Sequence, residues 1–279
     1  MLPQKFKNVE VSMARYVALS KTEHREAGLL PTGNSHALER AVVPVVAEEM
    51  NQVLPTMPLA FVSQGEGSAY ELVVLQSLQP GVNVYVHTDG RWIGGYRPAW
   101  YRAHPFRLVR DESGSRRVVC VDEDSEAFQK VGGVDARPLF NAEGEPMEAT
   151  RRLLEFLEKF ENAREVTQAL VNQLDEAGLI VPWQISAKSA GGESGYDVQG
   201  AYHIDENAMR NLEPETAARL LKSGALSIAM TQLLSEHRLQ GVARLYELRQ
   251  KASQQSSAPK EEVDLEALFA DEDDGDLKF

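Results

Sequence analysis

A chain of 279 residues, 43% hydrophobic and 25% charged, has the composition of a globular protein, which excludes fibrous and wholly disordered classes and fits one large domain or two closely packed ones. Its formal net charge of −13 is uneven, because residues 261–279 contribute −8 and leave −5 for residues 1–260. The body of the chain shows no basic stripe that would neutralise phosphates, so direct nucleic-acid binding is not expected.

The termini and the single cysteine indicate where the protein works. The N-terminal residues lack an apolar stretch of secretory length, and no segment reaches the roughly 20 apolar residues of a membrane helix. Cys120 lies in an apolar run and has no partner for an intrachain disulfide, so we expect a buried, unreactive thiol. These features predict a soluble cytoplasmic protein; the alternative is export without a cleaved N-terminal signal.

Short strands are predicted over residues 57–121, after a first segment of about 55 residues that gives no clear pattern. Asp89 and Gly90 can form a tight hairpin turn, and valines alternate with polar or aromatic residues between positions 82 and 87. The pattern predicts an antiparallel meander with one buried face. Its expected strands are Leu59–Val62, Tyr70–Gln76, Val82–His87, Arg91–Tyr96, Phe106–Arg110 and Arg116–Val121.

A long helix is predicted to cover this sheet. Apolar residues recur at helical spacing from Leu153 to Leu174, and Gly178 lies where a left-handed residue would end the helix. The pattern fits one helix of about seven turns or two helices broken near Asn162.

The C-terminal half is predicted to be mostly helical. Ser186–Gly200 is a flexible loop by composition. Asp205 should cap one helix, and Gly224 should separate two others. The whole chain is therefore predicted to have an α+β fold, with a single body over residues 1–252, β-rich at 57–121 and helical at 147–250, followed by a linker and a disordered acidic tail over 253–279.

The stretch Gly95–Phe106, "GYRPAWYRAHPF", is the strongest candidate for a ligand site. Its aromatic rings offer stacking surfaces, its arginines can grip a carboxylate and its histidine is a titratable donor. The alternative is a corner between strands, where prolines restrict the backbone and aromatic rings fill the edge of the core. The candidate ligand-binding residues are Arg97, Trp100, Tyr101, Arg102 and His104.

Known catalytic and metal-binding motifs give no support for an activity. His87 with Asp89, and His203 with Asp205, have the His-x-Asp spacing of non-haem iron ligands. A hairpin turn and a helix cap explain these aspartates better. The phosphate-binding glycine loops and the G-x-S-x-G nucleophile motif do not occur. We therefore expect no metal and no cofactor, and we assign no catalytic residue.

The acidic tail is a candidate docking peptide for a protein partner. Its apolar residues would share one helical face, and the acids before the terminal Phe resemble the docking tips of bacterial single-stranded-DNA-binding proteins and uncleaved C-terminal export signals. A merely solubilising end is the alternative, and the oligomeric state is not indicated. The candidate partner-binding residues are Leu265, Leu268, Phe269, Asp273, Asp274, Asp276 and Phe279.

An ordered series of segments resembles the bacterial SapC family: "YRPAWYRAHPF", "VVCVDEDS", "PLFNAEGEP", "GLIVPW" and "AYHIDENAMRNL". The resemblance implies a soluble protein named after a surface-layer gene cluster, with relatives encoded beside flavin-dependent halogenase-like genes. Two hypotheses follow. The first is a non-enzymatic binding or adaptor protein associated with the surface layer or with export. The second is an enzyme or accessory subunit acting with halogenase-like enzymes on aromatic or peptide substrates.

Overall fold

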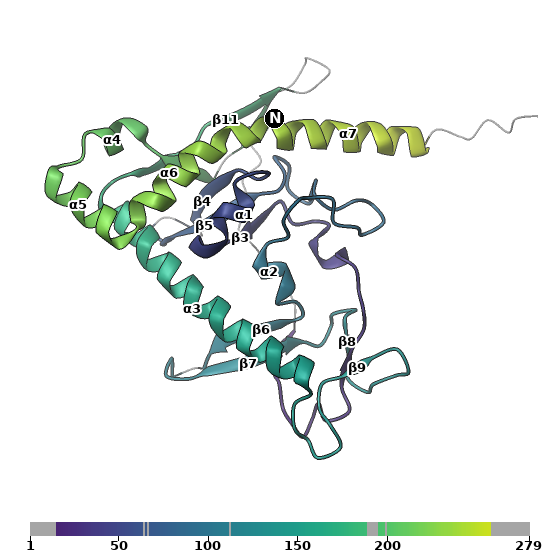
Figure 1. The fold of residues 1–279 in the computed structure, drawn as a ribbon. Helices are drawn as coiled ribbons and strands as arrows, with labels where there is room; N and C mark the ends of the chain where they lie inside the picture. The colour runs from purple at the N-terminus through teal and green to yellow at the C-terminus, as the bar shows by residue number, and fades with distance from the viewer. Residues whose placement is uncertain are drawn as a thin grey trace, which may run out of the picture.

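A computed structural model describes residues 15–63, 65, 67–111, 113–188, 195–198 and 200–257, and it confirms the predicted α+β class (Figure 1). The larger sheet has five antiparallel strands in the order β10-β13-β4-β5-β3. Their bounds are Ile180–Pro182, Ala201–Ile204, Leu59–Ser63, Tyr70–Leu75 and Val42–Pro44. The apolar residues of β4 and β5 are buried at the centre of this sheet and form the main core.

A second sheet has three strands in the order β1-β7-β6, with bounds Tyr16–Ala18, Arg117–Asp122 and Phe106–Arg110. A small sheet places β2 (Gly28–Leu29) between β8 (Phe128–Gln129) and β9 (Arg137–Pro138). The strands β11 (Ile185–Lys188) and β12 (Gly195–Val198) pair as an antiparallel hairpin. Within the predicted loop Ser186–Gly200, paired strands are therefore present, contrary to the expectation from its glycine content.

The helix α3 (Glu148–Glu176) joins the two larger sheets, since it packs against both β5 and β6 (Figure 1). It passes through Asn162 without a break and is followed by Gly178 at φ 67°, as the single-helix alternative predicts. Its buried face includes Leu157, Phe160 and Val171. The predicted covering helix is confirmed, and it spans a junction between sheets rather than one sheet.

The helical C-terminal region consists of α4 (Glu206–Arg210), α5 (Pro214–Ser223), α6 (Ala225–Ser235) and α7 (Leu239–Ser257), with the short 3-10 helix η3 (Glu236–Arg238) before α7. Asp205 caps α4 by accepting hydrogen bonds from the backbone N–H groups of Asn207 and Ala208. Gly224 lies between α5 and α6 at φ 93°. Both predicted signals are confirmed, whereas α7 continues to Ser257, into the segment predicted as a linker.

Two predicted strands, Val82–His87 and Arg91–Tyr96, do not form, and only an isolated bridge between Val86 and Trp92 connects them. The buried Asn83 explains the difference, because its Oδ1 accepts the N–H of Tyr85 at 2.9 Å and bends the backbone locally. Arg249 on α7 also donates to the carbonyl oxygens of Asn83 and Val86, both at 2.6 Å. These carbonyls are thereby satisfied outside a strand ladder.

The other four predicted strands are present as two hairpins in different sheets, β4 with β5 and β6 with β7. The segment between the hairpins contains α2 (Ala99–Arg102), a short helix that leads into β6. Short 3-10 helices η1 (Ser35–Ala37) and η2 (Ala47–Glu49), with α1 (Met50–Val53), lie in the N-terminal part that gave no clear pattern. Among the described residues, no helix is long and apolar enough to cross a membrane.

Buried polar side chains of α6 close a gap between β4 and β13. Gln232 accepts the N–H of Ile204 at 2.9 Å and donates to the carbonyl of Leu59 at 3.3 Å. Ser235 accepts the N–H of Leu59 at 2.8 Å. Since β4 and β13 pair only at Phe61 and Val62, these side chains satisfy backbone groups that the ladder leaves free.

The substitution Gln232→Leu should lower the free energy of unfolding by about 2–4 kcal/mol, because it leaves buried backbone groups of Leu59 and Ile204 without partners. Urea denaturation followed by circular dichroism measures the change. The exposed Gln240 on α7 offers the matched control Gln240→Leu, for which we expect a change below about 0.5 kcal/mol. Equal stabilities of the two variants would contradict this role for Gln232.

Candidate functional site

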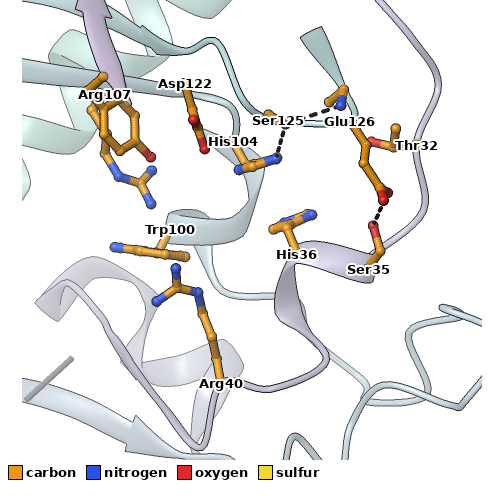
Figure 2. Close-up of a pocket in the computed structure, with 12 residues that line it drawn as sticks. Thr32, Ser35, His36, Arg40, Trp100, His104, Arg107, Asp122, Ser125 and Glu126 are labelled. Carbon is orange, nitrogen blue, oxygen red and sulfur yellow. Dashed lines mark hydrogen bonds between the residues drawn. The ribbon is translucent and has the colours of Figure 1, made fainter. Parts of the chain in front are cut away.

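Two cavities lie where the two larger sheets meet. The first, of about 280 Å³, is bordered mainly by polar and charged side chains (Figure 2). Its lining residues are Tyr16, Thr32, Ser35, His36, Arg40, Trp100, His104, Arg107, Asp122, Ser125, Glu126 and Ala127. They come from segments far apart in the sequence, including β1, η1, α2, β6 and the turn after β7.

Trp100 is held between two guanidinium groups at one end of the first cavity. The Cζ atom of Arg107 lies 3.9 Å from the centroid of the Trp100 ring, and that of Arg40 lies 4.5 Å away. Figure 2 shows the two arginines on opposite sides of the ring. A positive charge over an indole face is attracted by the electrons of the ring. The arrangement therefore fixes two cations close to one another.

The position of Trp100 depends on the buried carboxylate of Glu49. One oxygen of Glu49 accepts the N–H of Ala99 and the hydroxyl of Tyr96, both at 2.8 Å, and the other accepts the N–H of Val46 at 3.0 Å. The side chain of Glu49 thus anchors the first residue of α2 to the core. Trp100, the next residue, is held in place from that anchor.

Neither guanidinium of the Trp100 pair has a carboxylate partner within the described ranges. The only hydrogen bond that the Arg107 side chain makes there goes to the carbonyl of Phe106 at 3.1 Å, and the Arg40 side chain makes none. Burial lowers the pKa of Arg107 to about 10 and also lowers the pKa of Arg40. Among the described residues, these two partly desolvated positive charges therefore have no carboxylate in direct contact.

Two stacked histidines form the opposite part of the cavity. The rings of His36 and His104 are 4.0 Å apart and inclined by only 5°. Burial, followed by repulsion from Arg97, lowers the pKa of His36 to about 4. Burial, followed by repulsion from His36, lowers the pKa of His104 to about 3. Both rings are therefore neutral at pH 7.

The neutral histidines have unequal hydrogen bonding. His104 Nε2 lies 2.8 Å from the hydroxyl of Ser125. Both ring nitrogens of His36 are buried, and the backbone of Tyr101, which opposes the lowering of the His36 pKa, lies nearby; within the part of the chain that the structure describes, neither nitrogen makes a hydrogen bond of normal geometry. Unpartnered buried nitrogens are costly. His36 thus presents hydrogen-bonding capacity that a ligand in the cavity would satisfy.

Two carboxylates also line the first cavity, and each accepts a hydrogen bond from another residue of the chain. Asp122 accepts the N–H of Asp124 at 3.2 Å, and Glu126 accepts the hydroxyl of Ser35 at 3.4 Å. Neither forms an ion pair with Arg40 or Arg107 under a 4.0 Å limit. The carboxylate of Asp122 nevertheless lies close enough to Arg107 to oppose the lowering of that arginine's pKa, although the two side chains form no direct ion pair.

The second cavity, of about 400 Å³, adjoins the first and lies beside the edge strand β6 and under α3. It shares Tyr16, Trp100 and Arg107 with the first cavity. Its other lining residues are Pro44, Glu71, Ala103, Leu108, Val109, Arg110, Leu157, Phe160, Glu161 and Arg164.

The structure divides the five predicted ligand-binding residues. Trp100 and His104 line the first cavity. Tyr101 is buried in the core, where its hydroxyl donates to Gln76 and accepts from Asn83. Arg97 donates to Asn34 at 2.9 Å, and the exposed Arg102 lies over the ring of Phe156. The stretch is thus a corner and also part of a cavity wall.

Sequence reasoning missed the residues that complete the cavity, including His36, Arg40, Arg107 and Ser125. Arg107 follows the quoted stretch immediately, so extending that stretch by one residue would have included it. His36 and Arg40 share a helical spacing of four, but nothing in their local sequence points to Trp100. Their convergence is a product of tertiary packing.

The remaining sequence predictions concern the His-x-Asp pairs, Cys120 and the acidic tail. His87 contacts Asp89 at 2.9 Å, but Asp89 also accepts the N–H of Arg91, as expected of a turn residue. No group of three His, Cys, Asp or Glu side chains among the described residues is placed to hold a metal ion. Cys120 is half-buried rather than buried, and burial raises the pKa of its thiol. The candidate tail residues 265–279 lie outside the described residues.

The contact of Ser125 with His104 resembles a nucleophile and its base. A general base works best when its pKa lies near the working pH, and the pKa of His104, lowered to about 3 by burial, is far below neutrality. The hydroxyl of Ser125 also accepts the N–H of Ala127 at 3.1 Å, which is typical of a turn. With its pKa lowered in this way, His104 is a poor general base for Ser125.

The histidine pair should make stability depend on pH. The unfolded histidines take up protons as the pH falls through about 6.5, whereas the folded rings resist protonation until about pH 4. The free energy of unfolding should therefore fall between pH 7 and pH 5, and His36→Gln should reduce that fall by about 1 kcal/mol. Denaturation in urea at both pH values measures it.

The exposed His237 provides the matched control, since His237→Gln should leave the fall unchanged. If His36→Gln and the unsubstituted protein lost equal stability between pH 7 and pH 5, the histidine pair would not be the origin of the dependence.

Comparison with known proteins adds a family to this geometry. No curated protein and no solved structure matches the chain significantly. A sequence model of the SapC family matches residues 19–242, which include Arg40, Trp100 and Arg107. Because this match spans most of the chain, the protein belongs to the SapC family.

Proposed function

We propose that this protein is a non-enzymatic binding protein whose ligand presents an anionic group to Arg40 and Arg107. The observation that carries the proposal is the pair of guanidinium groups on Trp100, which lack a carboxylate partner among the described residues. Guanidinium groups bind carboxylates and phosphates through strong, directional hydrogen bonds. An anion in the first cavity would supply the missing counter-charge.

The free-energy cost of burying the two arginines supports this proposal. A buried charge without a partner lowers stability, because the folded state loses water that solvates the ion. Stacking on Trp100 returns only about 0.5–2 kcal/mol for each cation. Elsewhere in the same region, Arg164 pairs with Glu71 and Glu161. Carboxylates of the protein therefore do pair with an arginine at this junction. A bound anion would explain why Arg40 and Arg107 have no such partner.

The family association and the acidic tail belong to the same proposal. An adaptor role at the surface layer or in export would join the ligand-binding body to a protein partner through residues 261–279. The composition of the tail, nine acids among apolar residues, is the support for that partner.

The Arg pair is tested by titrating the purified protein with benzoate, benzyl alcohol and benzylamine in a calorimeter. Benzoate should bind, and the neutral and cationic analogues should bind at least tenfold more weakly. Arg107→Gln and Arg40→Gln should each weaken benzoate binding by about ten- to hundredfold, which corresponds to losing one charge-assisted hydrogen bond. Circular dichroism checks that the variants are folded.

Arg102→Gln is the matched control, because Arg102 comes from the same stretch but is exposed and lines neither cavity. It should bind benzoate as the unsubstituted protein does. Benzoate binding that survives both Arg40→Gln and Arg107→Gln, or that benzyl alcohol equals, would overturn the proposed function.

The tail is tested by comparing proteins captured from source lysate with the full chain and with a chain lacking residues 261–279. A partner that binds only the full chain is expected. Identical sets of captured proteins would exclude docking through the tail while leaving the ligand site untouched.

A further inference from the structure

The second cavity lies against the same arginine and offers a different chemistry. It is lined by residues of β6, an edge strand of the three-stranded sheet, by Pro44 of β3, an edge strand of the five-stranded sheet, and by residues of α3, which packs against β5 and β6. Arg107 and Trp100 line both cavities. A group bound to Arg107 therefore lies next to both cavities.

The lining of the second cavity is mostly apolar, and the charged residues that border it are paired, apart from Arg107. Ala103, Leu108, Leu157 and Phe160 contribute apolar side chains. The arginines and glutamates there pair in three contacts: Arg164 with Glu71 at 3.4 Å, Arg164 with Glu161 at 3.0 Å, and Arg110 with Glu165. Among the four arginines that line the two cavities, only Arg40 and Arg107 lack such a pair within the described part of the chain.

We infer that the ligand is an amphipathic carboxylic acid, with its carboxylate at Arg107 and Arg40 and its aliphatic or aromatic body in the second cavity. This inference rests on the proposed function, because it takes the anionic group at the arginines as given. Small-molecule sites combine a mostly apolar lining with a few placed polar groups. The paired cavities have this composition only when they are considered together.

The carboxylates of the first cavity define the charge of the ligand. Asp122 and Glu126 line that cavity beside the arginines, so a dianionic head such as a phosphate monoester would meet stronger repulsion than a single carboxylate does. The polar lining there also disfavours an apolar body, since burying apolar groups against unsatisfied polar atoms such as those of His36 brings no hydrogen bonds. The body of the ligand is therefore assigned to the second cavity.

Chain length is the variable that tests this assignment. The purified full-length protein is titrated with acetate, hexanoate, octanoate and 1-octanol below their aggregation limits. Affinity for the acids should rise about three- to fourfold for each methylene group that enters the second cavity, and 1-octanol should bind at least tenfold more weakly than octanoate. Arg107→Gln should weaken octanoate binding by at least tenfold.

A substitution in the second cavity distinguishes the contribution of the ligand's apolar body to binding from that of its carboxylate. Val109 lines the cavity but is 45% exposed, so Val109→Trp fills space with little risk to folding. This variant should weaken octanoate binding by at least tenfold and leave acetate binding unchanged. Val134 is fully exposed and lines neither cavity, so Val134→Trp serves as the control and should bind both acids normally.

The possible failures are distinguishable. If octanoate binds no more tightly than acetate while both depend on Arg107, the amphipathic ligand is wrong and the proposed function stands. If no acid depends on Arg107, both are wrong. If 1-octanol equals octanoate and Val109→Trp weakens both, the second cavity binds apolar molecules without an anionic head, which also overturns the inference.

Discussion

The stacking of two partly buried guanidinium groups on Trp100 is the constraint around which this region is organised. Arg40 precedes β3 of the larger sheet, and Arg107 lies on β6 of the smaller one. Trp100 lies between them on α2, so the contact joins the two sheets. Like charges at such short range repel one another, and burial strengthens that repulsion. The sheets therefore meet at a point that favours an anion.

Side chains of the stretch from Gly95 to Phe106 fall into two groups at this junction: some stabilise the core and others line the first cavity. Tyr96 binds Glu49 and Tyr101 binds Gln76, so both hydroxyl groups stabilise the core. Trp100 and His104, which alternate with these core residues along the short helix and the turn after it, face the first cavity instead. The segment is thus both a corner between strands and one wall of the first cavity, where we propose that the ligand binds.

Local signals in the sequence predicted the elements that are determined by interactions between residues close together in the chain. Helical spacing over α3, the aspartate cap at Asp205 and the glycine at 224 depend on neighbouring residues, and the structure has all of them. The strand expected at residues 82–87 does not form, because the buried side chain of Asn83 accepts the N–H of Tyr85, two residues on, and donates to the carbonyl of the distant Ala37. Periodicity does not reveal a buried polar side chain of this kind.

The candidate site was predictable in part for the same reason. An unusual density of aromatic and cationic residues identified Trp100 and His104, whereas Arg40 and His36 reach the cavity only through tertiary packing, in which His36 stacks on His104. Within Gly95–Phe106, composition does not reveal which side chains line the cavity, which are buried in the core and which face solvent. Pairing of the surrounding arginines with glutamates, visible only in three dimensions, then singled out the two without partners.

The most direct measurement is a crystal structure of the protein grown with 4-bromobenzoate, whose bromine is located by anomalous scattering. The account predicts a carboxylate within hydrogen-bond distance of the guanidinium of Arg107 and the bromine in the second cavity. A structure in which Arg107 forms an ion pair with Asp122 or another carboxylate of the protein, and no anion lies in the first cavity, would contradict it.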